Sequence, residues 1–321
     1  MSCLLKHDKA HSNTTINKMK IQLAKTIGAL LTAGLFTLPN CLQAQPTAHY
    51  PTGLEGLKGA SLPPPGVYLR DYNWFYYGDH INDSQGNRAV DQTAFIYAQA
   101  PRLLWITEVK LLDGYLGVDA LMPFFYKDLK GVDHDFSAGD LFFEGTWSWH
   151  LKQWDLAVGA GAWAPTGEYS VWGNPNGGLV ANPVLGGQGY WTEMLTAGAT
   201  WYPDEDKKWS VSVLNRYEFN QKQEDTDITV GQAYTVEGGI SYAVAKPIDI
   251  GVIGYYQQKV TGDTGPVENQ TPRNRVAAIG PEVSAFFPEI TLGISLRYAY
   301  EFLAENRLQG NTVTLTITKR F

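Results

Sequence analysis

Nine charged side chains stand at alternate positions of segments that are otherwise apolar or small, and these are the residues best suited to do chemistry in the chain. Carboxylates and guanidinium groups form strong, directed ion pairs when they face one another. Alternation places them on one face of neighbouring strands, where Arg216 is expected to meet Glu237 and Arg297 to meet Glu282. The inward-facing candidates are Asp119, Asp140, Glu144, Arg216, Glu218, Glu237, Glu282, Arg297 and Glu301.

Catalytic and metal-binding constellations are not evident. A serine–histidine–acid triad needs a base within reach of the nucleophile, but Ser148 and His150 share inward parity beside a short turn, without an amide partner at the right depth. His134 and Asp133 lie in a loop on which no further ligands converge, as a metal site would require. The sequence therefore predicts no enzyme, no catalytic residue, no metal and no cofactor.

The composition narrows the class of protein. The chain has 321 residues and a formal charge of −7, and 13% of its residues are aromatic while only 18% are charged. Few charges and many aromatics argue against a disordered chain, and the acidic balance argues against nucleic acid as a partner. Two cysteines are too few for a disulfide scaffold. Abundant Gly, Tyr and Trp favour strands and aromatic belts over helices.

The start of the chain has the order of a secretory signal. Three lysines precede the apolar run 26–38, a Pro-Asn pair ends that run, and Ala44 supplies a small residue for cleavage. This order predicts a signal peptide over 1–44, in which residues 1–18 are an over-extended start. The protein is therefore expected to be exported.

The rest of the chain alternates with a period of two, which is typical of strands with one apolar face. Aromatic residues gather near the ends of these segments, and short polar breaks alternate with long Gly-, Asn- and Asp-rich ones, as in barrels of the bacterial outer membrane. We expect an antiparallel transmembrane β-barrel over 67–321, and its twelve strands are predicted at 67–77, 92–107, 113–127, 136–151, 154–168, 190–202, 208–220, 232–245, 248–260, 274–287, 290–303 and 311–321.

This arrangement has consequences that a structure can test. The long loops are expected at 78–91, 128–135, 169–189, 221–231, 261–273 and 304–310. Pro101 has no N–H to donate to a ladder, so a bulge or kink is expected in its strand. The alternative fold is a soluble β-sandwich that buries the apolar faces between two sheets.

The last predicted strand carries a signal at its end. Val313, Leu315 and Ile317 alternate with threonines, and the chain stops on Phe321. A terminal Phe after alternating apolar residues is similar to the carboxy-terminal signal that the outer-membrane assembly machinery reads. Phe321 is therefore the predicted assembly signal, and that machinery and the outer-membrane lipid are predicted partners.

The segment 45–66 precedes the first strand and is predicted to be periplasmic. Pro63, Pro64 and Pro65 impose extended geometry on it. Together with Lys58, they make the segment a candidate plug that threads into the barrel and gates it. The alternative is a periplasmic tail without a function.

In a barrel the inward charges line the lumen, and two interpretations remain open. They are either ion pairs that fill a narrow interior, where an unpaired charge would be costly, or a polar path that sets selectivity. Loop 169–189 is a second gate candidate, because Trp172, Leu179 and Leu185 suit a constriction, an external site for an aromatic solute, or a loop that packs on itself.

Several motifs resemble one known family. They are Gly53–Gly59, Ser61–Tyr68 with its Pro-Pro-Pro-Gly-x-Tyr element, Tyr72–Tyr77, Pro101–Thr107 and the terminal Phe321. Over about residues 50–321 the chain is similar to the "MetA-pathway of phenol degradation" family. The resemblance implies a transporter-like β-barrel of the outer membrane of Gram-negative bacteria, linked to meta-cleavage degradation of phenol, and it implies no catalytic motif.

The expected function is an outer-membrane channel or transporter for small hydrophobic or aromatic compounds. One alternative is a structural or adhesion-type barrel with a filled lumen. Another is an outer-membrane lipid-modifying enzyme. Solute uptake, conductance and lipid hydrolysis distinguish the three.

Overall fold

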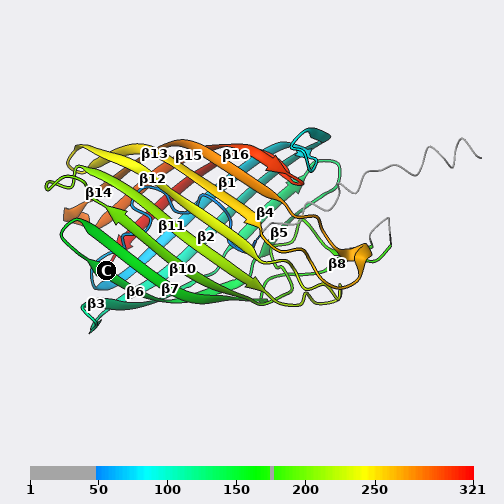
Figure 1. Cartoon of the computed structure of the whole chain (residues 1–321), viewed down its shortest axis with the longest axis horizontal. Coiled ribbons are helices and arrows are strands. Elements are labelled where there is room, and N and C mark those ends of the chain that lie inside the picture. Colours follow the sequence, from blue (N-terminus) through cyan, green and yellow to red (C-terminus); the bar gives the residue numbers. More distant parts are fainter. Residues whose placement is uncertain (1–47, 174–176) are drawn as a thin grey trace, which may run out of the picture. The chain divides into compact units, whose positions relative to one another are not determined.

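The computed structural model describes residues 48–173 and 177–321, so the predicted signal peptide lies outside the described residues. Twelve antiparallel strands form a closed ring (Figure 1). They are β1 (Gly66–Asn82), β2 (Arg88–Leu111), β3 (Gly114–Leu121), β6 (Leu141–His150), β7 (Trp154–Ala164), β10 (Thr192–Trp201), β11 (Trp209–Asn220), β12 (Ala233–Ala245), β13 (Ile248–Lys259), β14 (Arg275–Phe287), β15 (Leu292–Glu305) and β16 (Leu308–Arg320).

The ring closes because β1 pairs with β16 along one edge and with β2 along the other. Neighbours in the chain are neighbours in the ring, which is the topology of an up-and-down barrel. The predicted all-β barrel is therefore confirmed, and the sandwich is wrong. No helix in the described part of the chain is long and apolar enough to cross a membrane.

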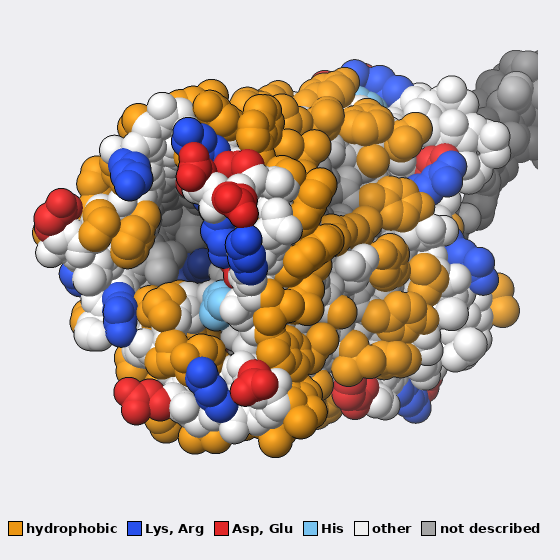
Figure 2. Space-filling model, turned by 60° about the vertical axis from the view of Figure 1, so that its left-hand side comes forward, with side chains coloured by type: hydrophobic (Ala, Val, Ile, Leu, Met, Phe, Trp, Pro, Cys, Tyr) orange, Lys and Arg blue, Asp and Glu red, His pale blue; other side chains and the backbone are white. Residues whose placement is uncertain are grey.

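The outward side chains are apolar and exposed, whereas the inward ones are buried. Along β11, Val211 and Val213 are exposed while Ser212 and Arg216 are buried. Figure 2 shows hydrophobic side chains spread over the flank of the barrel. The large apolar residues that are more than half exposed include Leu103, Trp105, Val118, Leu195, Ile240, Val252 and Ile279. Such a surface suits acyl chains and would be costly in water.

Aromatic residues cluster at the barrel end that carries the short turns. The rings of Trp154 and Trp201 are 6.0 Å apart, and those of Trp209 and Tyr242 are 4.8 Å apart. All four lie at or near the ends of their strands beside short turns. This is the expected aromatic girdle, where amphipathic rings meet the membrane interface.

The short and long connections alternate as predicted, with three corrections. The predicted long loops 78–91, 128–135 and 304–310 are tight hairpins. β1, β2, β15 and β16 continue beyond the predicted ends, and Phe124–Leu129 pairs with Asp133–Ala138 across a turn at 130–132. The extensions are polar, so they do not show the apolar alternation that marks the lipid-facing part of a strand. Long connections remain at 165–191, 221–232 and 260–274, all opposite the short turns.

The wall is interrupted in one region, which we call the wall break. The predicted strand 113–127 is divided at Met122–Pro123 into β3 and β4 (Phe124–Leu129). The predicted strand 136–151 is divided at Gly139–Asp140 into β5 (Asp133–Ala138) and β6. β4 and β5 pair with each other, and β4 continues along the outer part of β2.

The prediction of a bulge or kink at Pro101 is wrong for β2, the strand that contains this proline. β2 runs through Pro101, which stays in register with Asp71 of β1. The carbonyl oxygen of Pro101 accepts a hydrogen bond from the Met122 N–H at 3.2 Å. The edge of Pro101 that lacks a donor therefore faces the wall break, and the irregularity falls on the neighbouring strand.

The long connection 165–191 closes the wall break. The Glu168 N–H donates to the Ala138 carbonyl at 3.0 Å, and the Gly187 N–H donates to the Glu168 carbonyl at 2.9 Å. The main chains approach so closely that a Cβ on Gly167 would lie 2.6 Å from the carbonyl carbon of Gly139. Glycine is therefore required at this contact.

Candidate functional site

Residues 48–65 run inside the barrel ahead of β1, and we call them the plug (Figure 1). The wall meets the plug backbone with side chains rather than with a strand ladder. Trp74 donates its indole N–H to the Thr52 carbonyl at 3.1 Å, and the Leu57 N–H donates to Glu282 at 2.9 Å. Arg297 donates to the carbonyl of Leu54. Contacts of this kind can be released without breaking the sheet.

Seven ionisable side chains, Glu55 among them, form what we call the charged cluster. They are Glu55, Arg70, Arg102, Asp119, Glu144, Arg216 and Glu237. Glu55 of the plug lies 3.1 Å from Arg70 and 3.7 Å from Arg102, and it accepts a hydrogen bond from the Tyr72 hydroxyl. Burial alone would raise the pKa of Glu55, but Arg70 and Arg102 outweigh it and hold that pKa below its usual range.

Arg102 connects the plug to two wall carboxylates. It binds Asp119 at 2.7 Å and Glu144 at 3.0 Å, and all three side chains are buried. Removing the guanidinium would leave two buried carboxylates without their partner. Arg102 therefore holds the wall together as well as the plug.

The first residues of the plug rest on the opposite wall. The Arg216 guanidinium lies 3.9 Å from the centroid of the Tyr50 ring and forms an ion pair with Glu237. The Tyr50 hydroxyl donates to Glu237, and the Tyr50 N–H donates to Glu218 at 3.1 Å. Cation–π and ionic contacts thus fix one plug residue against β11 and β12.

The nine inward candidates are all buried inside the barrel. The expected ion pairs Arg216–Glu237 and Arg297–Glu282 are both present. Six candidates touch the plug directly, namely Asp140, Arg216, Glu218, Glu237, Glu282 and Arg297. Asp119 and Glu144 reach it through Arg102, and Asp140 binds His49. Glu301 instead accepts hydrogen bonds from Tyr76 and Tyr255.

The gate candidates of the plug lie at its end nearest β1. The Lys58 ammonium is 2.9 Å from the Asp249 carboxylate of β13. The Pro64 carbonyl accepts a hydrogen bond from the Tyr68 hydroxyl at 2.6 Å, and the Pro65 carbonyl accepts one from Arg320 at 2.8 Å. Pro63 is half-buried and Pro64 is exposed. The three prolines therefore lead the plug into β1 rather than occupying the centre of the lumen.

The gate candidates of the long loop are separated by the structure. Trp172 lies in β8 (Val171–Gly173) and Leu179 in β9 (Leu179–Ala181). These two short strands pair only with each other, at the end of the barrel that carries the long connections (Figure 1). The Leu179 N–H donates to Asn269 of η1 (Val267–Asn269) at 2.7 Å. Leu185 lies nearer the wall break, where its carbonyl accepts from Lys127 at 2.5 Å.

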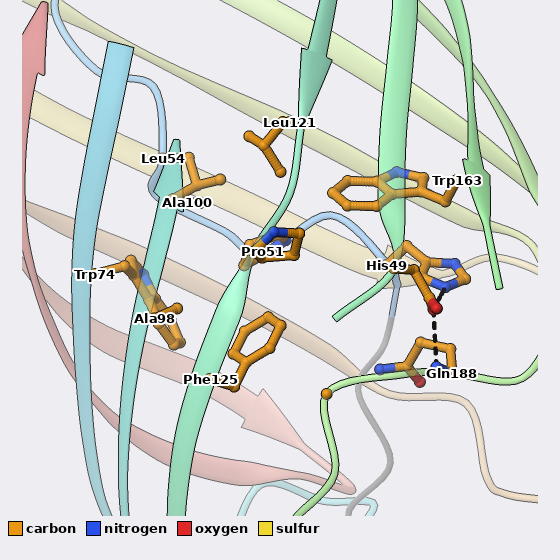
Figure 3. Close-up of a pocket in the computed structure, with 13 residues that line it drawn as sticks. His49, Pro51, Leu54, Trp74, Ala98, Ala100, Leu121, Phe125, Trp163 and Gln188 are labelled. Atoms are coloured by element: carbon orange, nitrogen blue, oxygen red, sulfur yellow. Dashed lines mark hydrogen bonds and ion pairs between the residues drawn. The ribbon is translucent and has the colours of Figure 1, made fainter. Parts of the chain in front are cut away.

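A cavity lies between the plug and the wall break, and we call it the apolar pocket (Figure 3). Its free volume is about 30 Å³, enough for one or two water molecules. A smaller cavity of about 10 Å³ separates it from the charged cluster. The side chains around the apolar pocket include Leu54 of the plug and Trp74, Leu121, Phe125 and Trp163 of the wall.

His49 and Asp140 form the polar edge of the apolar pocket. His49 Nε2 is 2.8 Å from Asp140, and Nδ1 is 2.6 Å from the Thr192 hydroxyl. Asp140 also accepts the N–H groups of Gly167 at 2.9 Å and of Gln188 at 2.8 Å. One carboxylate thus joins the plug, the wall break and the loop that closes it. Burial lowers the pKa of His49, and Asp140 opposes that shift.

Sequence reasoning missed Glu55, Arg70, Arg102 and His49. Arg70 and Arg102 could have been found, because they have the inward parity of Tyr72 and of Leu104 in their own strands.

Within residues 48–173 and 177–321, no group of three or more His, Cys, Asp and Glu is placed to hold a metal. His150 is hydrogen-bonded to Asp155 at 2.9 Å.

The comparison with protein-family profiles shows which family the chain belongs to. The sequence profile described as "Putative MetA-pathway of phenol degradation" matches residues 78–317. The chain belongs to this family. The resemblance seen in the sequence is thereby confirmed. No curated protein sequence matches the chain.

Solved structures are similar to the barrel of this family member. The COG4313 outer membrane channel from Pseudomonas putida F1 is 15% identical, with 85% of this chain and 99% of that chain covered and a TM-score of 0.69. The translocator domain of the autotransporter NalP from Neisseria meningitidis is 9% identical over 81% and 90%, with a TM-score of 0.49. The first likeness shows a shared fold. A closed barrel with an apolar outer band is the architecture of the Gram-negative outer membrane, so the predicted localisation is confirmed.

Proposed function

We propose that this protein is an outer-membrane channel for small hydrophobic or aromatic compounds, and that the plug closes it at rest. The observation that carries the proposal is that a separate segment of the chain fills the lumen through side-chain contacts alone. Eight strands leave a lumen that side chains fill, whereas 16–18 leave an open channel. A ring of twelve has room for one extended segment, and that segment can move without unfolding the wall.

The solute class is supported by three observations. The family is described by its association with phenol degradation. A protein of the same fold is described as an outer membrane channel. The apolar pocket beside the plug is lined mainly by aliphatic and aromatic side chains, which is typical of sites for apolar ligands.

Deleting residues 46–62 from the mature protein tests the gate. We expect single-channel conductance in planar bilayers to rise, because the charged cluster would lose Glu55 and the lumen would lose its filling. The matched control is Arg88→Ala, which removes an exposed ion pair at the outer end of β2 and should leave conductance unchanged. Equal conductance of the deletion variant and the intact protein would contradict the gate.

Uptake tests the solute class independently. A strain that lacks the protein should take up phenol and toluene more slowly than its parent, and the intact gene should restore the rate. Equal uptake of every such compound by both strains would contradict the transport proposal.

The second candidate function is a structural barrel, and one observation favours it. The two cavities beside the plug have free volumes of only about 30 and 10 Å³. A correctly folded deletion variant that conducts no ions would support this candidate.

The assembly role of Phe321 stays a prediction, and replacement of that exposed residue by Ala should lower the amount of folded barrel in the membrane.

A further inference from the structure

The apolar pocket is assembled from three parts of the chain that are distant in sequence. The plug, the wall on both sides of the wall break, and the loop that closes the break each contribute to it (Figure 3). Anything bound there would touch all three at once. The lining residues that matter here are Pro51, Leu54, Trp74, Phe125, Trp163 and Gln188.

The chemistry of the lining favours an apolar, aromatic ligand. Trp74, Phe125 and Trp163 supply aromatic rings, and Leu54 and Pro51 supply aliphatic surface. Aromatic side chains interact with another ring in offset-stacked or edge-to-face geometry. A single aromatic ring is therefore the best match to these walls.

One polar group at the pocket has no partner. The indole N–H of Trp163 makes no hydrogen bond with the described residues, although the side chain is only 3% exposed. A buried donor without an acceptor costs free energy. Trp163 borders both the apolar pocket and the smaller cavity beside it. A ligand oxygen that accepts this N–H would remove the cost.

The charges around the pocket argue against an anion. Its titratable lining residues in the described chain are His49 and Asp140, which are bonded to each other. Lys127 lies 5.1 Å from the centroid of the Phe125 ring, but it is bonded to the Leu185 carbonyl and does not line the pocket. A carboxylate ligand would face Asp140 without a cation to neutralise it.

We propose that the apolar pocket is a binding site for an uncharged one-ring aromatic molecule bearing a hydroxyl oxygen, and that its binding displaces the plug. The site rests on the proposed channel function and names the class of solute that opens it. The ring lies among Trp74, Phe125 and Trp163, and the oxygen accepts the indole N–H of Trp163. Phenol is the simplest molecule of this class.

The size of the pocket couples binding to opening. A cavity that holds benzene has a volume of about 150 Å³, whereas the apolar pocket has about 30 Å³ free. The wall is fixed by its ladders, but Pro51 and Leu54 belong to the plug, which side chains alone hold. The ligand therefore fits only where these residues have moved. A ligand that binds the displaced state better shifts the population toward it.

Binding is tested on the full mature protein in detergent. Phenol, toluene and benzoate are titrated by calorimetry at neutral pH, with empty micelles as the blank. Phenol should bind, toluene should bind about five- to tenfold more weakly because it lacks the oxygen, and benzoate should not bind. Crystals soaked in 4-bromophenol should show bromine in the apolar pocket.

Two variants separate the ring from the hydrogen bond. Trp163→Phe keeps a ring and removes the N–H, so the affinity for phenol should fall to that for toluene. Ala100→Leu fills the pocket from β2 and should weaken both ligands, while Ala299→Leu, at a buried site of β15 away from the pocket lining, should weaken neither. If either pocket variant fails to fold, the bromine position in the unchanged protein still decides.

Three results would overturn the site: benzoate binding as tightly as phenol, unchanged phenol affinity in a folded Trp163→Phe variant, or bromine located elsewhere. Failure of the channel proposal is distinguishable. Phenol bound at this pocket without conductance or uptake would support the site and contradict the channel. Conductance after plug deletion without phenol binding would support the channel and contradict the site.

Discussion

The charged cluster and the apolar pocket lie on two sides of one short stretch of plug, and they hold it in different ways. Glu55 meets Arg70 and Arg102, whereas its neighbour Leu54 lines the apolar pocket. Ion pairs are directional, and losing one partner leaves a buried charge uncompensated. Apolar contacts have no fixed direction, and free volume remains on that side. The cluster thus determines where the plug rests, and the pocket is where a solute can replace it.

The largest effect is expected from Arg102→Met. Asp119 and Glu144 would keep their buried carboxylates and lose the guanidinium that binds both. We expect the free energy of unfolding to fall by about 3–5 kcal/mol, measured by urea titration of the detergent-solubilised barrel. Arg88→Met is the control, because its ion pairs are exposed and should contribute nothing measurable.

Adding Asp119→Asn to Arg102→Met should restore part of the lost stability, since one uncompensated charge is then removed. A double variant no more stable than Arg102→Met would contradict the assignment of the loss to unpaired charge.

A smaller and more local effect is expected from Glu55→Gln. The variant keeps the shape of the side chain but replaces charged hydrogen bonds to Arg70 and Tyr72, which should weaken plug docking by about 1.5–3 kcal/mol. Conductance should rise while the barrel stays folded. Glu193→Gln, on an exposed side chain of β10, should change neither. Global unfolding of Glu55→Gln would show that the cluster supports the wall rather than the plug.

The difference between the two regions also explains what the sequence could predict. The pairs Arg216–Glu237 and Arg297–Glu282 were predictable, because strands adjacent in the chain are adjacent in the ring and parity gives the face. The twelve strands followed from the same alternation, since lipid outside and polar groups inside impose it on every strand.

The plug contacts and the wall break could not be predicted in this way. Glu55 and His49 lie in a segment without periodicity, so their partners depend on a path through space that no pattern specifies. At the wall break, the strands stop for only two residues, at Met122–Pro123 and at Gly139–Asp140. The period-two pattern continues through both interruptions, so it does not reveal them. Large inward aromatics such as Trp163 were missed because the inward face was expected to carry small and polar residues.

Acidification should affect the pocket side of the plug. Burial lowers the pKa of His49 from 6.5, although its hydrogen bond to Asp140 opposes the shift. The docked plug then binds fewer protons than the released plug, so its stability is fully present above about pH 6.5 and declines as the pH falls below that value. Glu218 and Tyr190 also face His49. Conductance should rise as the pH falls from 7.5 to about 5.

His49→Gln is the matched variant for this experiment, because glutamine keeps hydrogen-bonding groups but does not titrate. Its conductance should rise less than that of the unchanged protein over the same range. Identical pH profiles of the variant and the unchanged protein would assign the response to another group. Glu55 cannot be the cause above pH 5, because its lowered pKa retains its charge there.

The smallest effect is expected when a small side chain is enlarged at the apolar pocket, where free volume remains, rather than at a closely packed site elsewhere in the interior. Ala98→Val adds two methyl groups at the edge of the apolar pocket, whereas Ala299→Val adds them at a buried site of β15 that packs against Ile253 and its neighbours. The first should change the free energy of unfolding by less than about 1 kcal/mol, and the second should lower it by about 1–3 kcal/mol. Urea titration of both variants measures the difference. Equal losses would mean that the pocket side of the plug is packed as rigidly as the rest of the interior, and a solute could then enter only by disrupting the charged cluster as well.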